Sequence, residues 1–363
     1  MKITRRVLFL TLFVPWLLAP QGVREAKDQK AAEILAKQRR GEPVTAEEKA
    51  LVERAQARRM EEYARANPPR ESTGLVPLTD LGSGAYKGEQ DGLYPGGRNL
   101  PPPAHLKAGL QWAAQIAPLD AEGRQSADGR IVLLSIGMSN TTQEFQAFQK
   151  LAAAEGAINP RLVIVDGAQG GQTAAVTADP QANFWKVVDQ RLSVAGVTAR
   201  QVQVVWLKQA NAGPKEPFPA EARRLAGHIT GTLHNLNDRF PSLKIAYLSS
   251  RIYAGYASTP LNPEPHAYET AFAVKWVVSD QIAGQPALNY DPAKGAVRCP
   301  WLAWGPYLWA DGVKGRSDGL VYLREDLGPD GTHPSMSGRA KVAKQLLEFL
   351  KKDPTSRAWF LKP

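Results

Sequence analysis

Four short runs of apolar, largely β-branched residues recur from residue 130 onward, and helical patterns separate them. The runs are Ile131–Leu134, Leu162–Val165, Val202–Leu207 and Ile245–Leu248. Stretches that predict helices lie around 143–154, 182–195, 219–239, 267–283 and 336–351. Buried strands that alternate with helices are typical of a parallel sheet covered on both faces. The pattern therefore predicts one α/β domain over residues 130–363.

The chain before this domain follows two other patterns. Residues 23–69 are rich in Ala, Glu, Lys and Arg and predict a charged helical extension. Thr45 and Glu48 have the spacing of a capping box, and the helix that they begin should run to about Ala66, just before two prolines. Its mostly charged surface indicates a solvated stalk or a weakly docked arm. Residues 70–129 are rich in Gly and Pro and predict a segment that wraps the domain.

Residues 1–22 predict a signal peptide. The basic start MKITRR precedes an apolar stretch, Val7–Ala19, that has the length of a signal-peptide core and falls short of the roughly 20 residues of a spanning helix. The protein is therefore expected to be secreted or periplasmic. Two alternatives stay open here, an uncleaved N-terminus that tethers the chain to a membrane and a twin-arginine signal at Arg5-Arg6.

Charge and cysteine content narrow the class of protein further. Of the formal charge of +10, half comes from residues 1–67, which hold 14 Lys/Arg and 9 Asp/Glu. The rest is spread thinly, without the basic cluster of a nucleic-acid footprint, so no nucleic-acid partner is expected. Cys299 is the only cysteine, so no disulfide can form within the chain and a hydrophobic core must supply the stability.

Candidate chemistry follows the predicted strands. In open α/β sheets, functional groups gather in the loops at the carboxyl ends of the strands. Those loops are Gly137–Thr141, Asp166–Thr173 and Lys208–Asn211, and the polar stretch Asp330–Ser335 directly precedes the last helix. Together they offer the groups that an acyl-transfer site needs.

Ser139, His333 and Asp330 fit the roles of a catalytic triad. A serine hydroxyl is a weak nucleophile until a base accepts its proton, and histidine is the usual base near neutral pH. Asp330 lies three residues before His333 and could hold the imidazole by its other ring nitrogen. The backbone N–H groups of Ser139 and Gly171 and the side-chain amide of Asn211 are the candidate donors of an oxyanion hole. None of these roles calls for a metal or another cofactor.

The same residues resemble the four sequence blocks of the SGNH/GDSL hydrolases. Those blocks supply a serine, a glycine, an asparagine and a D-x-x-H pair, which match Ser139, Gly171, Asn211, and Asp330 with His333 over roughly 130–351. The first block has Met138 in place of the family's Asp and is more similar to the Gly-Gln-Ser-Asn variant of some carbohydrate acetylesterases. The third has Gln209 and Ala212 where the family has Gly and Asp. The resemblance implies a flavodoxin-like three-layer sandwich with about five parallel strands.

Other interpretations of these residues remain. A lone serine often ends a buried strand, and D-x-x-H before a helix can serve only as a cap, but their joint occurrence in this order favours catalysis. An α/β-hydrolase is excluded because Thr141 stands where G-x-S-x-G needs its second glycine. His228 and His234 are interpreted as ordinary helix residues, and no metal site is expected around His266 with Glu264 and Glu269.

These observations lead to one functional hypothesis with two rivals. The hypothesis is a secreted serine esterase that removes short acyl groups, most plausibly acetyl, from a carbohydrate. Tyr253, Tyr256 and Trp304 are the candidate residues for stacking against the sugar, although core packing is the usual role of such rings. The rivals are a carbohydrate O-acyltransferase that uses the same site and a non-catalytic carbohydrate-binding envelope protein on a hydrolase fold.

Overall fold

The chain divides into two compact units, Met1–Ala66 and Asn67–Pro363. The computed structural model describes residues 21–39, 42–82, 84–90 and 92–362. Residues 1–20 of the predicted signal peptide lie outside the described residues. Among the residues that are described, none of the helices combines the length and the apolar character needed to cross a membrane.

The first unit is a pair of helices, α1 (Gln21–Arg39) and α2 (Ala46–Ala66). The predicted capping box is present at the start of α2, where Thr45 N–H donates to Glu48 Oε2 at 2.8 Å and Glu48 N–H donates to Thr45 Oγ1 at 3.1 Å. The two helices bury a small apolar cluster of their own, formed by Ala31, Ile34, Val52 and Ala55. The helix predicted to end near Ala66 is thus confirmed, and a second helix precedes it.

The second unit is built on a five-stranded sheet in the order β4-β3-β5-β6-β7, with all strands parallel. The strands are β3 (Ile131–Gly137), β4 (Leu162–Asp166), β5 (Val202–Lys208), β6 (Ile245–Ser249) and β7 (Trp301–Trp304). Numbered within the sheet, this order is 2-1-3-4-5, which is that of flavodoxin-like folds. The predicted α/β class with about five parallel strands is confirmed. The fifth strand, β7, was not among the four runs that the apolar pattern indicates.

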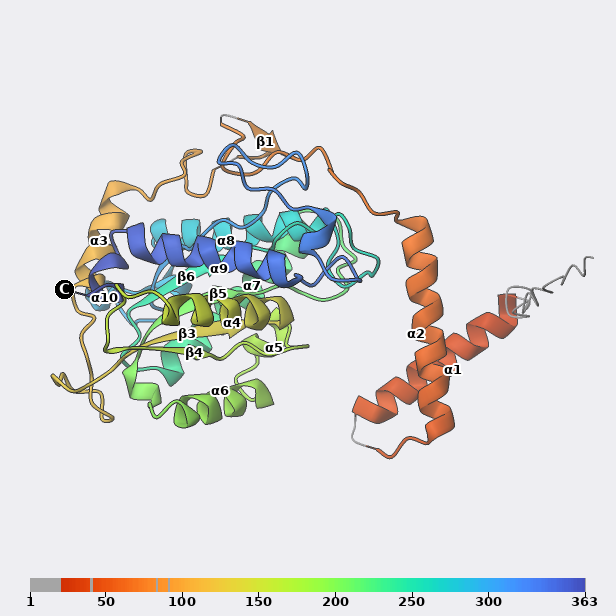
Figure 1. The fold of residues 1–363 in the computed structure, drawn as a ribbon, viewed down its shortest axis with the longest axis horizontal. Coiled ribbons are helices and arrows are strands. Elements are labelled where there is room, and N and C mark those ends of the chain that lie inside the picture. Colours follow the sequence, from red (N-terminus) through yellow and green to blue (C-terminus); the bar gives the residue numbers. More distant parts are fainter. Residues whose placement is uncertain (1–20, 40–41, 83, 91, 363) are drawn as a thin grey trace, which may run out of the picture. The chain divides into compact units, whose positions relative to one another are not determined.

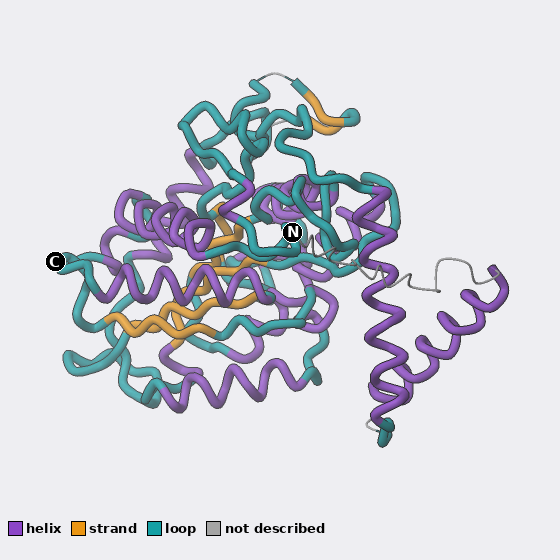
Figure 2. The backbone as a smooth tube through the Cα atoms, turned by 45° about the vertical axis from the view of Figure 1, so that its right-hand side comes forward, coloured by secondary structure: helices purple, strands orange, loops and turns teal. Residues whose placement is uncertain are grey.

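Helices cover both faces of this sheet (Figures 1 and 2). One face carries α4 (Ser139–Ala153) and α9 (Met336–Lys352), which pack against each other. The other carries α6 (Asn183–Val194), α7 (Ala220–Arg239) and α8 (His266–Ile282), with the short α5 (Ala174–Ala178) against α7. This three-layer arrangement leaves the carboxyl ends of the strands uncovered by helices, which is where the candidate residues lie.

The remaining elements are short. The chain closes with α10 (Arg357–Phe360), which packs on α9. Short 3₁₀ helices lie at Ala199–Gln201, Pro286–Leu288, Pro292–Lys294 and Arg324–Asp326.

The Gly/Pro-rich segment 70–129 is part of the second unit. It contains the strand pair β1 (Ala85–Tyr86) and β2 (Glu89–Gln90) and the helix α3 (Pro103–Ala113). Its first residues are held by the buried carboxylate of Asp311, which accepts from Ser72 Oγ at 2.6 Å and from Thr73 N–H and Oγ1, both at 2.7 Å. Residues 72–74 are therefore bound into the second unit, although they lie more than 230 positions from Asp311 in the chain.

Deleting residues 23–67 should leave the second unit folded and any hydrolytic kcat/KM within a few-fold. The reason is that the first unit has its own apolar cluster, whereas every candidate site residue lies in Asn67–Pro363. A longer deletion, 23–74, is the matched control. It removes the donors to Asp311, leaves that buried carboxylate without them, and should lower the melting temperature clearly. Loss of activity in the shorter deletion with intact folding would contradict this expectation.

Candidate active site

Ser139 lies at the first position of helix α4, two residues after strand β3 ends at Gly137. The helix therefore begins four residues earlier than the predicted 143–154. The turn is fixed on both sides, because Asn140 Nδ2 donates to the carbonyl of Thr332 at 2.9 Å and Thr141 Oγ1 donates to the carbonyl of Lys208 at 2.7 Å. The first N–H groups of a helix have no intrahelical acceptor, so the N–H of Ser139 is free to face a developing anion.

The structure brings Ser139, His333 and Asp330 into one line of hydrogen bonds. Ser139 Oγ lies 2.8 Å from His333 Nε2, and His333 Nδ1 lies 2.6 Å from Asp330 Oδ2. Because a carboxylate only accepts, Nδ1 carries a proton, and in the neutral ring Nε2 is then the acceptor for the serine hydroxyl. This is the arrangement in which histidine can remove the proton of Ser139.

The turn between Asp330 and His333 depends on Gly331. Gly331 has φ +65°, and a Cβ added there would stand 1.8 Å from the carbonyl oxygen of Tyr256. Asp330 Oδ1 accepts from the backbone N–H groups of Thr332 and His333, each at 3.0 Å. The carboxylate thus holds both the backbone and the ring of the histidine in place.

The pKa of Asp330 is lowered to about 2. Partial burial works to raise this pKa, but the hydrogen bonds from the His333 ring and from the N–H groups of His333 and Thr332 outweigh it. Because the folded pKa lies below the usual 3.8, ionised Asp330 contributes folding stability that is complete above about pH 4 and is lost as the pH falls through about 2. The carboxylate therefore keeps its charge over the whole neutral and mildly acidic range.

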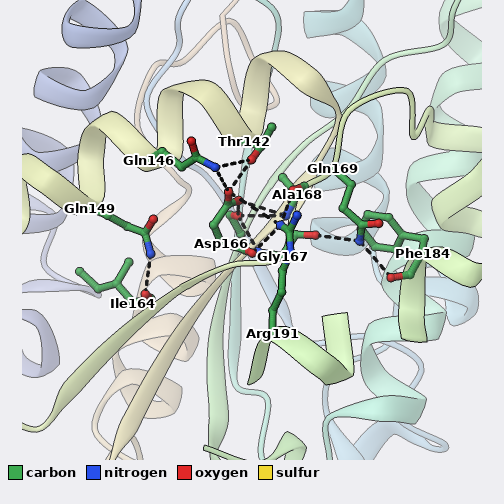
Figure 3. Close-up of polar contacts among 11 residues, drawn as sticks. Thr142, Gln146, Gln149, Ile164, Asp166, Gly167, Ala168, Gln169, Phe184 and Arg191 are labelled. Atoms are coloured by element: carbon green, nitrogen blue, oxygen red, sulfur yellow. Dashed lines mark hydrogen bonds and ion pairs between the residues drawn. The ribbon is translucent and has the colours of Figure 1, made fainter. Parts of the chain in front are cut away.

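Gly171 lies in the loop after β4, where its backbone adopts φ +74°. A Cβ added there would meet no heavy atom within 4 Å, so the loop presents bare backbone towards open space. The start of this loop is tied to its surroundings through Asp166 (Figure 3). Thr142 Oγ1 and Gln146 Nε2 of α4 donate to Asp166 Oδ2, and Arg191 Nη1 of α6 donates to the carbonyls of Asp166 and Ala168, both at 2.7 Å.

Asn211 follows β5 by three residues, and its side chain is bonded on both sides by helix α7. Its Nδ2 donates to Glu221 Oε1 at 2.9 Å, and its Oδ1 lies 2.9 Å from His228 Nδ1. Its backbone carbonyl accepts from Asn262 Nδ2 at 3.2 Å. Neither contact was expected from the sequence, in which Glu221 does not stand out and His228 is interpreted as an ordinary helix residue. Their separation of seven residues, two helical turns, is the one signal that could have placed them on a common face.

The three aromatic residues predicted to stack on a sugar are core residues instead. The exposed fractions of Tyr253, Tyr256 and Trp304 are 0%, 3% and 3%. Tyr253 OH donates to the carbonyl of Arg70 at 2.7 Å, and Trp304 Nε1 donates to the carbonyl of Leu93 at 2.6 Å, so the wrapping segment covers both rings. The prediction that these rings stack on a sugar is wrong, because they are buried in the core and have no accessible face for a ligand.

The other candidate ligands have structural partners. His234 Nε2 lies 2.7 Å from the carbonyl of Ala287, and His266 Nδ1 lies 3.3 Å from Glu269 Oε2. Glu264 accepts from backbone N–H groups and from Trp309 Nε1 instead of facing His266. Within the part of the chain that the structure describes, no three His, Cys, Asp or Glu side chains are grouped so that they could hold a metal ion.

No family model matches the chain, and no curated protein matches it significantly. Among solved structures, an acetyl esterase mutant with a bound acetate ion is 13% identical, with 60% of this chain and 94% of that chain covered and a TM-score of 0.31. The periplasmic domain of the lipopolysaccharide acetyltransferase of Salmonella ser. Paratyphi A is 11% identical, with 69% and 96% covered and a TM-score of 0.34. An extracellular lipase from Streptomyces rimosus is 11% identical, with 60% and 99% covered and a TM-score of 0.29. Likenesses at TM-scores this low carry no weight in the assignments below.

Proposed function

We propose that the protein is a serine esterase that hydrolyses short-acyl esters, acetyl esters above all, of a carbohydrate. The observation that carries the proposal is the chain of hydrogen bonds from Ser139 Oγ through the His333 ring to Asp330, with 2.8 Å and 2.6 Å between the bonded atoms. A structural cap would need only the backbone contacts of Asp330. It would not need a serine hydroxyl on the opposite side of the imidazole.

In this mechanism Ser139 Oγ attacks the ester carbonyl while His333 Nε2 accepts its proton. The charged imidazolium that forms is stabilised by Asp330, whose carboxylate is already ionised. His333 then donates the proton to the leaving alcohol, which leaves an acyl-Ser139 ester. A water molecule that loses a proton to His333 attacks this ester, the bond to Ser139 Oγ breaks, and Oγ takes the proton back from His333 as the acid leaves. The N–H groups of Ser139 and Gly171 and the Asn211 amide hold the oxyanion, and one well-placed donor of this kind is worth about 2.7–4 kcal/mol.

The surroundings of the triad favour a short acyl group. Among the described residues, the large apolar side chains that are strongly exposed on segments next to the site are Leu261, beside the Asn262 that contacts Asn211, and Met336, three residues after His333. Burying each methylene of an acyl chain is worth about 0.8 kcal/mol, so an enzyme for long chains needs a continuous apolar surface. Tyr253, Tyr256 and Trp304 are buried, so in this proposal they do not contact the sugar.

The predicted signal sequence supports export to the periplasm or beyond, and a membrane tether through residues 1–20 is the variant of that proposal. The O-acyltransferase remains the second candidate function, because an acyl-Ser139 intermediate is common to both reactions and only the acceptor differs.

Activity on acetyl, butyryl and octanoyl esters of one alcohol tests the acyl preference. We expect kcat/KM to be highest for acetyl and to fall with chain length, because the added methylenes find no apolar surface to bury them. A steady rise of kcat/KM to octanoyl would contradict the proposal.

Acetate release from an acetylated polysaccharide, measured with and without an added sugar acceptor, separates hydrolysis from transfer, since a transferase gives more acylated acceptor than free acetate.

A further inference from the structure

The side chain of Asn211 is held by two side chains of helix α7. Glu221 lies one residue into the helix and His228 lies two turns further along, and both bond to the Asn211 side chain, at 2.9 Å each. Asn211 and Glu221 are buried and His228 is half-buried. Glu221 in turn is paired with Arg224 of the same helix. A loop asparagine whose task was only to end strand β5 would not need two side chains of a neighbouring helix bonded to its amide.

The chemistry of these partners fixes which way the Asn211 amide faces. A carboxylate can only accept a hydrogen bond, so the amide nitrogen of Asn211 must face Glu221. The amide oxygen must then face His228, and His228 must carry its proton on Nδ1. Burial, and then the charge of Arg224, lower the pKa of His228, which favours the neutral ring with a single N–H. One of the two Nδ2 hydrogens is donated to Glu221, and the second remains for donation to a substrate.

We infer that Glu221 and His228 are positioning residues that set the orientation of the Asn211 amide, so that it presents an N–H and not a carbonyl oxygen to the substrate. This inference rests on the proposed esterase function. Asn211 follows β5, and Ser139 follows β3, its neighbour in the sheet, with Gly137 and Lys208 in register at the ends of the two strands. A reversed amide would direct a lone pair at the developing oxyanion and oppose the reaction that the correct orientation assists.

The test compares four single variants in the full-length protein. Glu221→Gln keeps the size of the side chain, but Arg224 holds the new amide oxygen, so that its NH2 group turns towards Asn211 and reverses it. We expect kcat to fall by about 10²–10³-fold with KM within threefold, as for the loss of one oxyanion donor. His228→Leu should lower kcat similarly. His228→Asn keeps a donor near the Nδ1 position and should retain kcat within a few-fold. His234→Leu, on the same helix but bonded to Ala287, is the matched control and should leave kcat unchanged.

Double variants separate positioning from general damage to the fold. Once Asn211→Ala has removed the amide, adding Glu221→Gln or His228→Leu should lower kcat by no more than twofold, because nothing is left to orient. Losses that multiply in the Asn211→Ala background would overturn the inference, and so would full activity of His228→Leu. If Glu221→Gln does not fold, the two His228 variants still decide the outcome. Ser139→Ala is measured alongside. If Ser139→Ala keeps its turnover, the proposed function is refuted. If Ser139→Ala loses its turnover but the losses of kcat multiply in the Asn211→Ala background, only the positioning role is refuted.

Discussion

Replacing Ser139 by alanine is expected to lower kcat by on the order of 10⁴–10⁶-fold and to abolish covalent labelling by an organophosphonate. In the proposed mechanism the Ser139 hydroxyl forms the acyl bond, and no other hydroxyl or thiol is hydrogen-bonded to the His333 ring among the described residues. The fold should survive, because the Oγ of Ser139 bonds only to the partly exposed His333 ring in the described structure. Mass spectrometry of the labelled peptide and a thermal melt of the variant are the two measurements.

The matched control is Ser193→Ala, which changes an exposed serine near the end of helix α6. It should label and turn over like the parent protein. His333→Gln and Asp330→Asn should also lose most turnover, the second because the imidazole would lose the charge that stabilises its protonated form. Labelling that persists at another serine in Ser139→Ala, or unchanged turnover, would remove the basis of the proposed function.

The strands of the sheet differ in how well the sequence alone predicts them. Strands β3 to β6 are buried parallel strands with runs of Val, Ile and Leu, so the apolar pattern predicted where each begins, but its runs end one residue early in β4, β5 and β6 and three residues early in β3. Strand β7 has only four residues, Trp301–Trp304, with the sequence WLAW. A run of four residues is too short for its hydrophobic periodicity to identify a strand.

The site shows the same limit at the level of single residues. That Ser139, His333 and Asp330 lie in one line of hydrogen bonds could be predicted, because two of them share one short loop and the third closely follows a recognisable strand. Glu221 and His228 could not, since the period of a helix shows which residues share a face but not which loop that face meets. The burial of Trp304 was also invisible in its local sequence, because the residues that cover it, Leu93 and Tyr94, lie about 210 positions earlier.

A buried ion pair beneath the site could likewise not be predicted from the sequence. Glu144 lies five residues after Ser139 on helix α4, and Lys208 is the last residue of β5. Their carboxylate and ammonium groups are in direct contact, and neither side chain has any exposed surface. Burial lowers the pKa of Lys208 to about 8 and raises that of Glu144, and the attraction between the two charges works against burial in both. Arg251, which lies close enough to lower the pKa of Lys208 further, adds a second buried positive charge.

Replacing Glu144 by glutamine should therefore destabilise the fold by about 3–5 kcal/mol at pH 7, because it leaves a buried ammonium group beside Arg251 without its counter-charge. In the variant the pKa of Lys208 should fall further below its value in the unfolded chain. The folded state then binds fewer protons than the unfolded state, so stability rises with pH, and the deficit against the parent should shrink as the pH is raised from 7 towards 9. Urea unfolding at several pH values measures both effects.

The double variant Glu144→Leu/Lys208→Met distinguishes a lost counter-charge from a lost contact. Two apolar side chains of similar size remove both charges of the pair at once and leave Arg251 with the opposing charges of Glu264 and Asp330, so most of the stability should return although the ion pair is gone. Thr141 bonds to the backbone carbonyl of Lys208, not to its side chain, so the turn that carries Ser139 keeps its anchor. Glu348→Gln, which breaks the exposed pair with Lys352 on α9, should leave the unfolding midpoint unchanged. A double variant as unstable as Glu144→Gln would show that this region depends on the bond itself and not on charge balance.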